Sequence, residues 1–303
     1  MTGPWPGTGA AVPSPGQDVL GLYLRCLRER AGLRLQDVAG RYGMSVPVLR
    51  WIERGTVLPT WAKTERMLRE QYQVPAGDSP VFEAAKALVA AQDPTAFDDL
   101  PGWYDRLAAV EHQTSPGRSF HVRLPPPPLC TPRYAQAVRP LREWRLADEH
   151  APTIPRPDSA GGPMGTVVLD YTVLRRPHGG HAMFAEQLRA LMRAVDERRA
   201  DLRVLAPDAD FAAWRCSNSL SERFRPGGRR LYVHEDWGVS YTSGLHGESR
   251  QGELLTRAVA PAARFWDARE LLHAVGGDHA LSLSDLAPVA AAGTNLLFSG
   301  RQT

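Results

Sequence analysis

The spacing of four small and apolar residues constrains the fold of this chain more than any other feature. Ala39, Gly43, Leu49 and Ile52 follow one another at intervals of four, six and three residues. Two short helices that cross at a tight turn need a small residue at their contact and a glycine in the turn. They also need apolar residues on their inner faces. The spacing therefore predicts a helix-turn-helix.

Helical periodicity surrounds this motif. An amphipathic helix is expected from Asp18 to about Gly32, because apolar residues recur there at helical spacing. Further helices are expected at residues 35–42, 46–54, 61–72 and 79–91. These five short helices predict an all-α domain over residues 17–92. The first 16 residues are rich in Gly and Pro and are expected to be a disordered arm.

Basic residues are concentrated on the same segment. Between Asp18 and Pro75 there are ten Lys or Arg against six Asp or Glu, whereas the whole chain has a formal net charge of +3. A basic excess on one module is the electrostatic pattern expected of nucleic-acid binding. The charge distribution therefore indicates DNA as a partner.

The pattern after residue 92 predicts a second domain. Residues 93–118 are expected to be a linker with a connecting helix, and the proline run at 124–132 favours extended backbone. Strands are expected at 165–174, 202–207, 229–237 and 238–244, and helices at 103–112, 181–199 and 250–274, with Pro261 as a kink or break. This alternation predicts an α+β or α/β domain over residues 119–276, followed by a tail at 277–303.

Cysteine usage and hydropathy exclude several classes of protein. Cys26, Cys130 and Cys216 are odd in number and far apart, so neither a disulfide framework nor a zinc site is expected. The chain shows no signal peptide and no run of about 18 apolar residues. It also lacks the GxSxG, GxGxxG, HExxH and phosphate-loop motifs. We therefore expect a cytoplasmic protein without membrane contact, metal or cofactor.

Two parts of the chain resemble known families. The stretch LRERAGLRLQDVAGRYGMSVPVLRWIERG resembles the XRE family of lambda-repressor-like helix-turn-helix regulators, whose usual pattern is LRxxxGLTQxELAxxLGxSxSxxSxIExG. The segments LPPPPLCTPRYAQAV and VVLDYTVLRRPHGGHAMFAEQLRAL are similar to the actinobacterial domain of unknown function that often follows such a module. The resemblance implies a five-helix DNA-binding domain, and a C-terminal domain that senses a ligand or binds a small protein partner.

The surface expected to contact DNA departs from that family's pattern. Regulators of this family begin the second helix with Ser or Thr and then Gln, where this chain has Arg34 and Leu35. On the recognition helix, the family's Ser, Lys, Ser and Arg correspond to Pro47, Val48, Arg50 and Trp51. The full set expected at the DNA is Arg34, Gln36, Ser45, Val46, Pro47, Arg50, Trp51 and Arg54.

These substitutions thin the predicted readout of bases. A bidentate side-chain contact to a base is worth roughly 1–3 kcal/mol, so the loss of two or three removes much of the sequence specificity. Ser45 is expected to cap the helix, which tolerates Pro47 in its first turn. Trp51 should rest on DNA, the second domain, a dimer mate, a small molecule or the neighbouring valines. Exposure of Trp51 beside Arg50 and Arg54 would favour DNA, whereas burial between domains would favour a metabolite.

Polar residues in the second domain form two further candidate groups. They are Asp170, Tyr171, His178 and His181 around a Gly-Gly turn at a helix start, and His234 and Asp236 in the expected strand pair. A helix N-terminus after glycines favours a carboxylate, an enolate or a phosphate. The second group contains residue types used in acid–base chemistry, but also those of an ordinary polar turn. No carboxylate at a suitable spacing completes a metal site, so none is expected.

The sequence thus leaves more than one function open. The first is a transcriptional regulator. Binding as a homodimer would predict two DNA half-sites roughly 34–36 Å apart. The second is a regulator-derived protein that has lost DNA readout. It would be a cofactor-independent enzyme of dehydration or cyclisation type, or a binder of a hydrophobic secondary metabolite, with Val46, Val48 and Trp51 closing an interdomain pocket. The third is a protein-interaction module.

Overall fold

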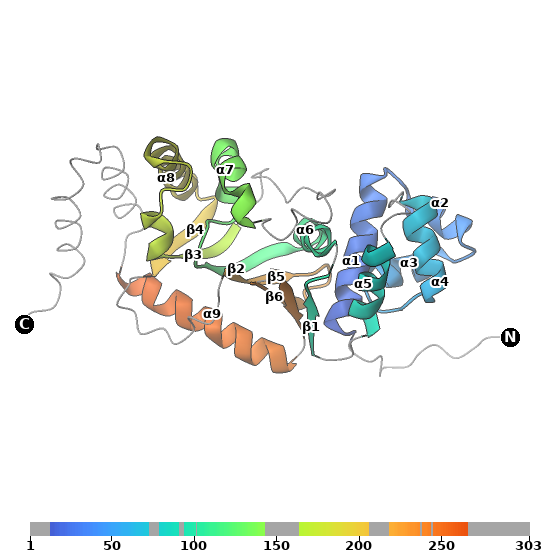
Figure 1. The fold of residues 1–303 in the computed structure, drawn as a ribbon. Coiled ribbons are helices and arrows are strands. Elements are labelled where there is room, and N and C mark those ends of the chain that lie inside the picture. The colour runs from blue at the N-terminus through green and yellow to red at the C-terminus, as the bar shows by residue number, and fades with distance from the viewer. Residues whose placement is uncertain are drawn as a thin grey trace, which may run out of the picture.

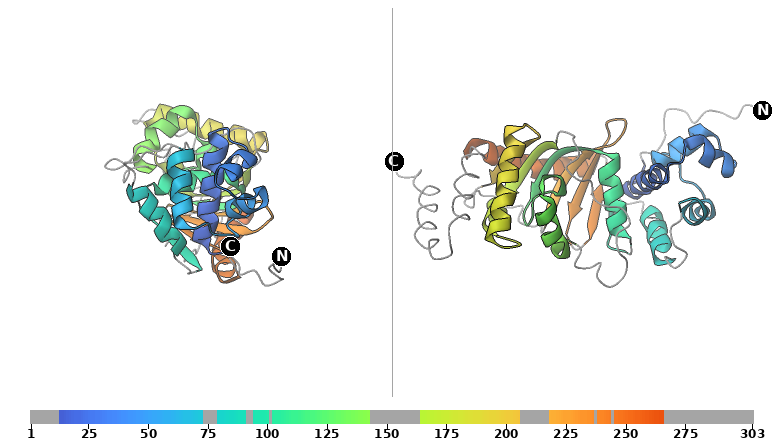
Figure 2. Two further views of the ribbon diagram at one scale, coloured as in Figure 1. Left: turned by 90° about the vertical axis from the view of Figure 1, so that its right-hand side faces the viewer. Right: turned by 90° about the horizontal axis from the view of Figure 1, so that it is seen from above.

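A bundle of short helices packs against one end of a seven-stranded sheet that carries helices on both faces (Figure 1). This computed structural model describes residues 13–72, 79–90, 94–100, 102–142, 164–205, 218–236, 238–243 and 245–265. The view from above in Figure 2 shows the bundle and the sheet domain side by side along the long axis of the molecule. An all-α N-terminal module followed by an α+β domain was predicted, and the structure confirms it.

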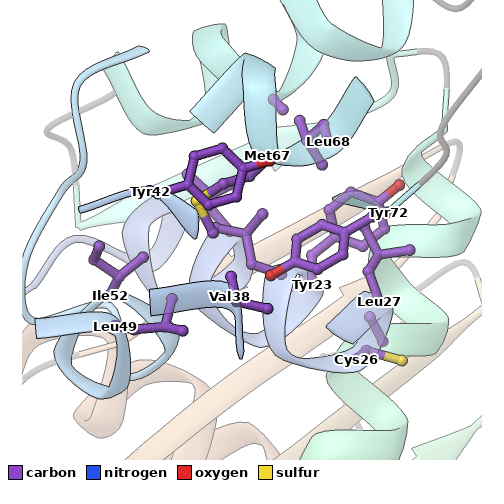
Figure 3. Packing of buried hydrophobic residues seen from close by; sticks show 14 of the residues in the cluster. Tyr23, Cys26, Leu27, Val38, Tyr42, Leu49, Ile52, Met67, Leu68 and Tyr72 are labelled. Carbon is purple, nitrogen blue, oxygen red and sulfur yellow. The ribbon is translucent and has the colours of Figure 1, made fainter. Parts of the chain in front are cut away.

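The N-terminal bundle contains the five predicted helices. They are α1 Pro15–Arg30, α2 Leu35–Arg41, α3 Val46–Glu53, α4 Trp61–Arg66, which continues into the π-helical turn η1 Met67–Gln71, and α5 Ser79–Ala90. Figure 3 shows how apolar side chains from these elements meet around Val38, Leu49 and Met67. The amphipathic pattern of each short helix is satisfied only by packing against the others.

The first helix begins earlier than predicted. Ser14 caps α1: its hydroxyl accepts a hydrogen bond from the Gln17 backbone N–H, and the Gln17 side chain accepts one from the Ser14 N–H. This reciprocal pair satisfies two backbone donors, so the helix starts at Pro15 instead of Asp18. Residues 13–16 therefore do not belong to the predicted arm. Residues 1–12 lie outside the described residues.

The sheet has the strand order β1-β7-β6-β5-β2-β3-β4. Its strands are β1 Thr95–Asp98, β2 Ser115–His121, β3 Met164–Asp170, β4 Ala200–Leu205, β5 Ser219–Phe224, β6 Arg230–Glu235 and β7 Val239–Thr242. β2, β3 and β4 pair in parallel, and the remaining neighbours are antiparallel. β6 therefore runs in the same direction as β2 and β3.

Helices cover both faces of this sheet (Figure 1). One face carries α6 Trp103–Gln113, α7 Pro132–Arg142 and α8 His181–Asp196, and the other carries α9 Leu245–Phe265. Val167 and Leu169 of β3 pack into the cluster that contains α8, whereas Val168 packs into the cluster that contains α9. This alternation is the period of two expected for a strand that is buried on both faces.

Several predicted elements are wrong in detail. Residues 95–98, expected in a linker, form the edge strand β1, because they pair antiparallel with β7. Asp98 also accepts two hydrogen bonds from the buried Arg106 of α6, at 2.6 and 2.7 Å. The strand expected at 165–174 ends at Asp170 and is followed by the 3-10 helix η3 Tyr171–Arg175. The proline run contains a second such turn, η2 Pro127–Leu129, instead of being extended throughout.

Two further strands, β2 and β5, were not predicted, and the last helix differs from its expected range. β2 contains a proline and a glycine, and β5 has polar residues on both faces, so neither shows a strand pattern. α9 begins before residue 250 and includes Pro261 without ending there. Residues 266–274 and the predicted tail at 277–303 lie outside the described residues.

α1 and α6 join the bundle to the sheet. Leu20 and Leu24 of α1 belong to the core of the bundle, whereas Val19 and Leu22 belong to a second cluster with Leu231 and other residues of the sheet. α6 likewise contributes alanines to the first core and larger side chains to the second. The two regions therefore share apolar packing. Within the described ranges, no helix is both long and apolar enough to cross a bilayer.

Candidate nucleic-acid interface

The turn between α2 and α3 has the geometry that the sequence predicts. Gly43 has a φ of +60°, a backbone conformation that side chains disfavour, and the Met44 N–H donates to the Ala39 carbonyl at 2.9 Å. Ala39, Leu49 and Ile52 are buried. The three apolar residues of the motif thus lie on its inner side, and Gly43 lies in the exposed turn.

The first turn of α3 accommodates its proline. The Ser45 hydroxyl accepts a hydrogen bond from the Val48 N–H at 3.4 Å and caps the helix. Pro47 lies in the first turn, where a backbone N–H has no partner within the helix. The missing N–H therefore removes no helical hydrogen bond. α3 keeps its structure but loses a polar side chain at this exposed position.

A buried ion pair holds α3 against α1. Glu53, at the end of α3, accepts hydrogen bonds from Nε and Nη2 of Arg28, the latter at 2.9 Å. Arg28 Nη1 also donates to the Leu33 carbonyl at 3.0 Å, which fixes the chain just before α2. The hydrogen bond that Arg28 donates to Glu53 raises the pKa of Arg28. Neither residue was among the predicted site residues, and this largely buried pair orients the motif.

The outer surface of α3 presents two stripes. Pro47 and Trp51, one helical turn apart, are exposed and form what we name the apolar stripe. Arg50 and Arg54, also one turn apart, are exposed and form the basic stripe. Within the described part of the chain, neither arginine of the basic stripe has an ion pair. α3 therefore offers solvent two guanidinium groups that no carboxylate neutralises.

Trp51 is exposed instead of closing a pocket. Its exposed fraction is 39%, a large value for a tryptophan. Val46 and Val48, expected beside it, pack partly against the core of the bundle. The apolar patch predicted from all three residues is therefore reduced to the apolar stripe. Sequence reasoning linked an exposed Trp51 beside arginines to DNA contact.

The start of α2 carries less free charge than the sequence suggests. Arg34 is exposed, but its Nε lies 3.0 Å from Asp37 Oδ2, and this hydrogen bond raises the pKa of Arg34. Gln36 is exposed. Leu35 packs partly against the bundle core, so it replaces a polar side chain at the start of the helix with an apolar one that faces inward.

A pocket of about 260 Å³ lies between the bundle and the sheet domain. Its walls come from α1, the start of α2, the end of α3 and the turn between β5 and β6, which we name the β5–β6 turn (residues 225–229). The lining residues are Leu22, Arg25, Arg28, Glu29, Leu35, Arg50, Glu53, Arg54, Arg225 and Pro226. It is an interdomain pocket, but the basic stripe lines it and Trp51 does not.

Asp18 and Arg225 form a buried ion pair where the bundle meets the sheet domain. Arg225 Nη1 forms an ion pair with Asp18, and Arg225 Nη2 donates to the Arg54 carbonyl at the end of α3. Arg229 also approaches Asp18, at 3.3 Å. Burial raises the pKa of Asp18 to about 6, although the two arginines act to lower it. Burial also lowers the pKa of Arg225.

In the second domain, Asp170 and Tyr171 have structural contacts. Asp170 is buried and caps η3 by accepting a hydrogen bond from the Thr172 N–H at 2.8 Å, and a second from the Thr172 hydroxyl. Tyr171 packs against the core cluster, with the Arg175 guanidinium 6.0 Å from its ring centroid. Both residues therefore serve the strand end.

The two histidines near α8 lie on the side of the sheet that carries α7. His178 precedes the helix, and burial lowers its pKa, with Arg176 and Arg123 acting in the same direction. His181 is the first residue of α8. A Cβ added to Gly179 would meet Ala137 of α7 at 3.2 Å, which places this loop against α7.

His234 and Asp236 do not join the first group. His234 aligns through β5 and β2 with Val168 of β3, so it faces α9. β6 lies three strands away from β3, a total distance of roughly 14 Å. Burial lowers the pKa of His234. Asp236 lies in the turn before β7. Among the described residues, no group of three His, Cys, Asp or Glu is arranged to hold a metal ion.

A polar row on the opposite face escaped the sequence reasoning. His121, Ser219 and Glu235 are cross-strand neighbours on β2, β5 and β6, and the Ser219 hydroxyl donates to Glu235 Oε1 at 3.0 Å. His121 and Ser219 are buried. The row could be found only from the pairing of β2 and β5, the two strands whose sequences do not show a strand pattern.

The fold and the α3 surface define a helix-turn-helix protein with an α+β C-terminal domain. Residues 19–77 match the family described as a helix-turn-helix domain, and residues 104–274 match the domain of unknown function DUF5753. The second match spans more than half of the chain, which therefore belongs to the DUF5753 family. No curated protein and no solved structure matches the chain. The helix-turn-helix domain indicates a DNA-binding transcriptional regulator.

Proposed function

We propose that this protein is an XRE-type transcriptional regulator of the cytoplasm that docks α3 in the major groove of DNA. The inner residues of the motif are buried and its turn is intact, so α3 is presented as a rigid recognition helix. The C-terminal domain is proposed to sense a ligand that alters this docking.

The observation that carries this proposal is the state of the basic stripe. Arg50 of α3 and Arg54 at its C-cap have no carboxylate partner in the described chain, whereas Arg25 and Arg28 of α1 and Arg34 before α2 are paired. Unpaired guanidinium groups on a recognition helix are suited to phosphate oxygens and to guanine. A structural role inside the protein would have given them acceptors.

The apolar stripe supports a mode of contact with little hydrogen bonding. Trp51 is large and partly exposed to water in the free protein, and contact with DNA would bury more of its apolar surface. Tryptophan and proline have few polar atoms with which to read base edges, but they can contact thymine methyl groups and sugars. The proposed regulator therefore binds with a strong phosphate component and modest base discrimination.

The experiment that tests this function is a salt titration of DNA binding. The full chain is titrated against fragments of its own upstream region at several salt concentrations, beside an Arg50→Ala/Arg54→Ala double variant. We expect specific binding, with the logarithm of the association constant falling linearly with the logarithm of the salt concentration. The double variant should bind more weakly, with a slope reduced by about 1 to 2.

Arg257→Ala is the matched control for charge removal. Arg257 lies on α9, which covers the sheet domain, and pairs with Glu253 on the same helix, 2.6 Å away. Its loss should leave both the affinity and the salt slope unchanged. Absence of specific binding at low salt, or an unchanged slope in the double variant, would argue against DNA docking through α3.

A further inference from the structure

The interdomain pocket carries more positive charge than its carboxylates neutralise. Five arginines line it against two glutamates. Guanidinium groups without carboxylate partners bind phosphate and carboxylate groups with good geometry. The excess therefore points toward an anion as the natural occupant of this space.

Both glutamates of the pocket are already engaged. Glu53 accepts two hydrogen bonds from Arg28, the more buried of the α1 arginines. Glu29 accepts a hydrogen bond from Arg25 Nε at 2.9 Å and another from Gln113 at 2.7 Å. The basic stripe, which lines the same pocket, has no acidic partner among the described residues. Its two charges remain available.

Arg225 provides a second, independent indication. Its side chain is only 4% exposed, yet its Nε has no hydrogen-bond partner in the described part of the chain. Its other two nitrogens are held by Asp18 and by the Arg54 carbonyl, so the guanidinium is fixed at the pocket wall. A buried donor without an acceptor is unfavourable, so this guanidinium keeps hydrogen-bonding capacity for an oxyanion.

We propose that this pocket binds a small metabolite bearing a phosphate or carboxylate group. The basic stripe and Arg225 hold the oxyanion, and apolar parts of the ligand contact Leu22, Leu35 and Pro226. The volume of about 260 Å³ suits a compact molecule at a domain interface. Phosphate and carboxylate groups both accept two parallel hydrogen bonds from a guanidinium group, so either kind of ligand fits the same donors.

Occupation of the pocket opposes DNA docking. The basic stripe that holds the anion is the one proposed to contact DNA, so each ligand weakens the other by the same factor. The anion thus acts as a releasing effector. This step rests on the proposed function, whereas binding of the anion does not.

The test of the site uses the full chain without DNA. Calorimetric titrations with sodium pyrophosphate and with sodium citrate, at constant ionic strength, are expected to show saturable binding at one site. Pro226→Glu places a carboxylate at the pocket wall and should weaken binding at least tenfold. Pro226→Gln is the matched control, because it changes the same turn without adding charge, and should retain the affinity.

The outcomes separate the two sources. Binding of pyrophosphate alone assigns a phosphate ligand, and binding of citrate alone assigns a carboxylate ligand. Absence of saturable binding of either at millimolar concentration overturns the proposal, as does equal affinity in Pro226→Glu and Pro226→Gln. If Pro226→Glu unfolds, Arg50→Ala replaces it, and an undiminished affinity there contradicts the site.

The test of coupling adds the upstream DNA fragment. Pyrophosphate or citrate, whichever binds, should lower the affinity for DNA at least threefold more than sodium chloride of the same ionic strength. An equal effect of both salts overturns the effector role. Anion binding without any DNA binding would leave the site intact and reject the regulator, whereas DNA binding without anion binding would do the reverse.

Discussion

Arg225 of the β5–β6 turn forms a buried ion pair with Asp18 in the first turn of α1. The same arginine donates to the Arg54 carbonyl at the end of α3. One side chain of the C-terminal domain thus contacts both the first helix and the recognition helix. Displacement of Arg225 would therefore remove one contact to α1 and one to the end of α3.

The first prediction concerns the stability of this pair. Asp18→Ala leaves the Arg225 guanidinium buried without its carboxylate, and we expect the free energy of unfolding to fall by about 3–5 kcal/mol. An Asp18→Ala/Arg225→Met double variant should lose less than the single variant, because no buried charge remains. Urea unfolding measures both. Arg34→Met, which breaks the exposed pair with Asp37, should leave the free energy of unfolding nearly unchanged. A double variant less stable than Asp18→Ala would contradict the prediction.

The second prediction concerns pH. Because burial raises the pKa of Asp18 from 3.8 to about 6, the folded chain binds more protons than the unfolded chain between these values. The contribution of Asp18 to stability therefore falls as the pH rises through this window. Relative to Asp18→Asn, which does not titrate, the native chain should lose about 2 kcal/mol between pH 4 and pH 7. Urea unfolding across this range measures the difference. A native chain that gains stability relative to Asp18→Asn would show that the ion pairs outweigh burial.

The helix-turn-helix could be predicted because its determinants are local. Ala39, Gly43 and Leu49 lie within one short stretch, and their spacing alone states which faces of two helices must meet. The exposure of Trp51 was one of two stated alternatives, and only the fold could select between them. The ion pair of Arg28 with Glu53 was not predicted, although both residues lie within residues 27–55, the stretch that resembles the XRE family. The charge of a residue gives no indication of whether it is buried.

The interdomain pocket could not be predicted, because it depends on contacts between distant segments. Nothing near Arg225 in the sequence indicates that it meets Asp18, and the strand β5 that leads to it has no alternation of apolar residues. The edge strand β1 was also not predicted, since its four residues depend on pairing with β7 and on the contact of Asp98 with Arg106, which the local sequence does not show. His234 and Asp170 were chosen as candidates by residue type, in two separate groups, and the strand order places them apart.

The third prediction compares two glycines with positive φ. A Cβ on Gly55 (φ +69°) would lie 2.9 Å from Asp18 Oδ1 and from the Gln17 carbonyl oxygen, whereas a Cβ on Gly43 (φ +60°) would meet nothing within 4 Å. Gly43→Ala should therefore cost only the left-handed backbone strain, about 1–2 kcal/mol. Gly55→Ala should cost more, because it also separates α1 from the end of α3. Thermal unfolding of both variants gives the comparison, and an equal loss would mean that the contact with α1 relaxes freely.

The fourth prediction separates the inner from the outer side of α3. Leu49 is fully buried, so Leu49→Ala should lower the free energy of unfolding by about 2–5 kcal/mol. Trp51→Ala changes an exposed side chain and should alter stability by about 0.5 kcal/mol or less, yet weaken DNA binding about tenfold, or 1.4 kcal/mol. Since tryptophan carries no charge, the salt dependence of binding should stay as in the native chain. Urea unfolding and DNA titration of the same preparations measure the three quantities. Unchanged DNA affinity in Trp51→Ala would mean that the apolar stripe serves another partner, while a large loss of stability would mean that Trp51 belongs to the bundle core.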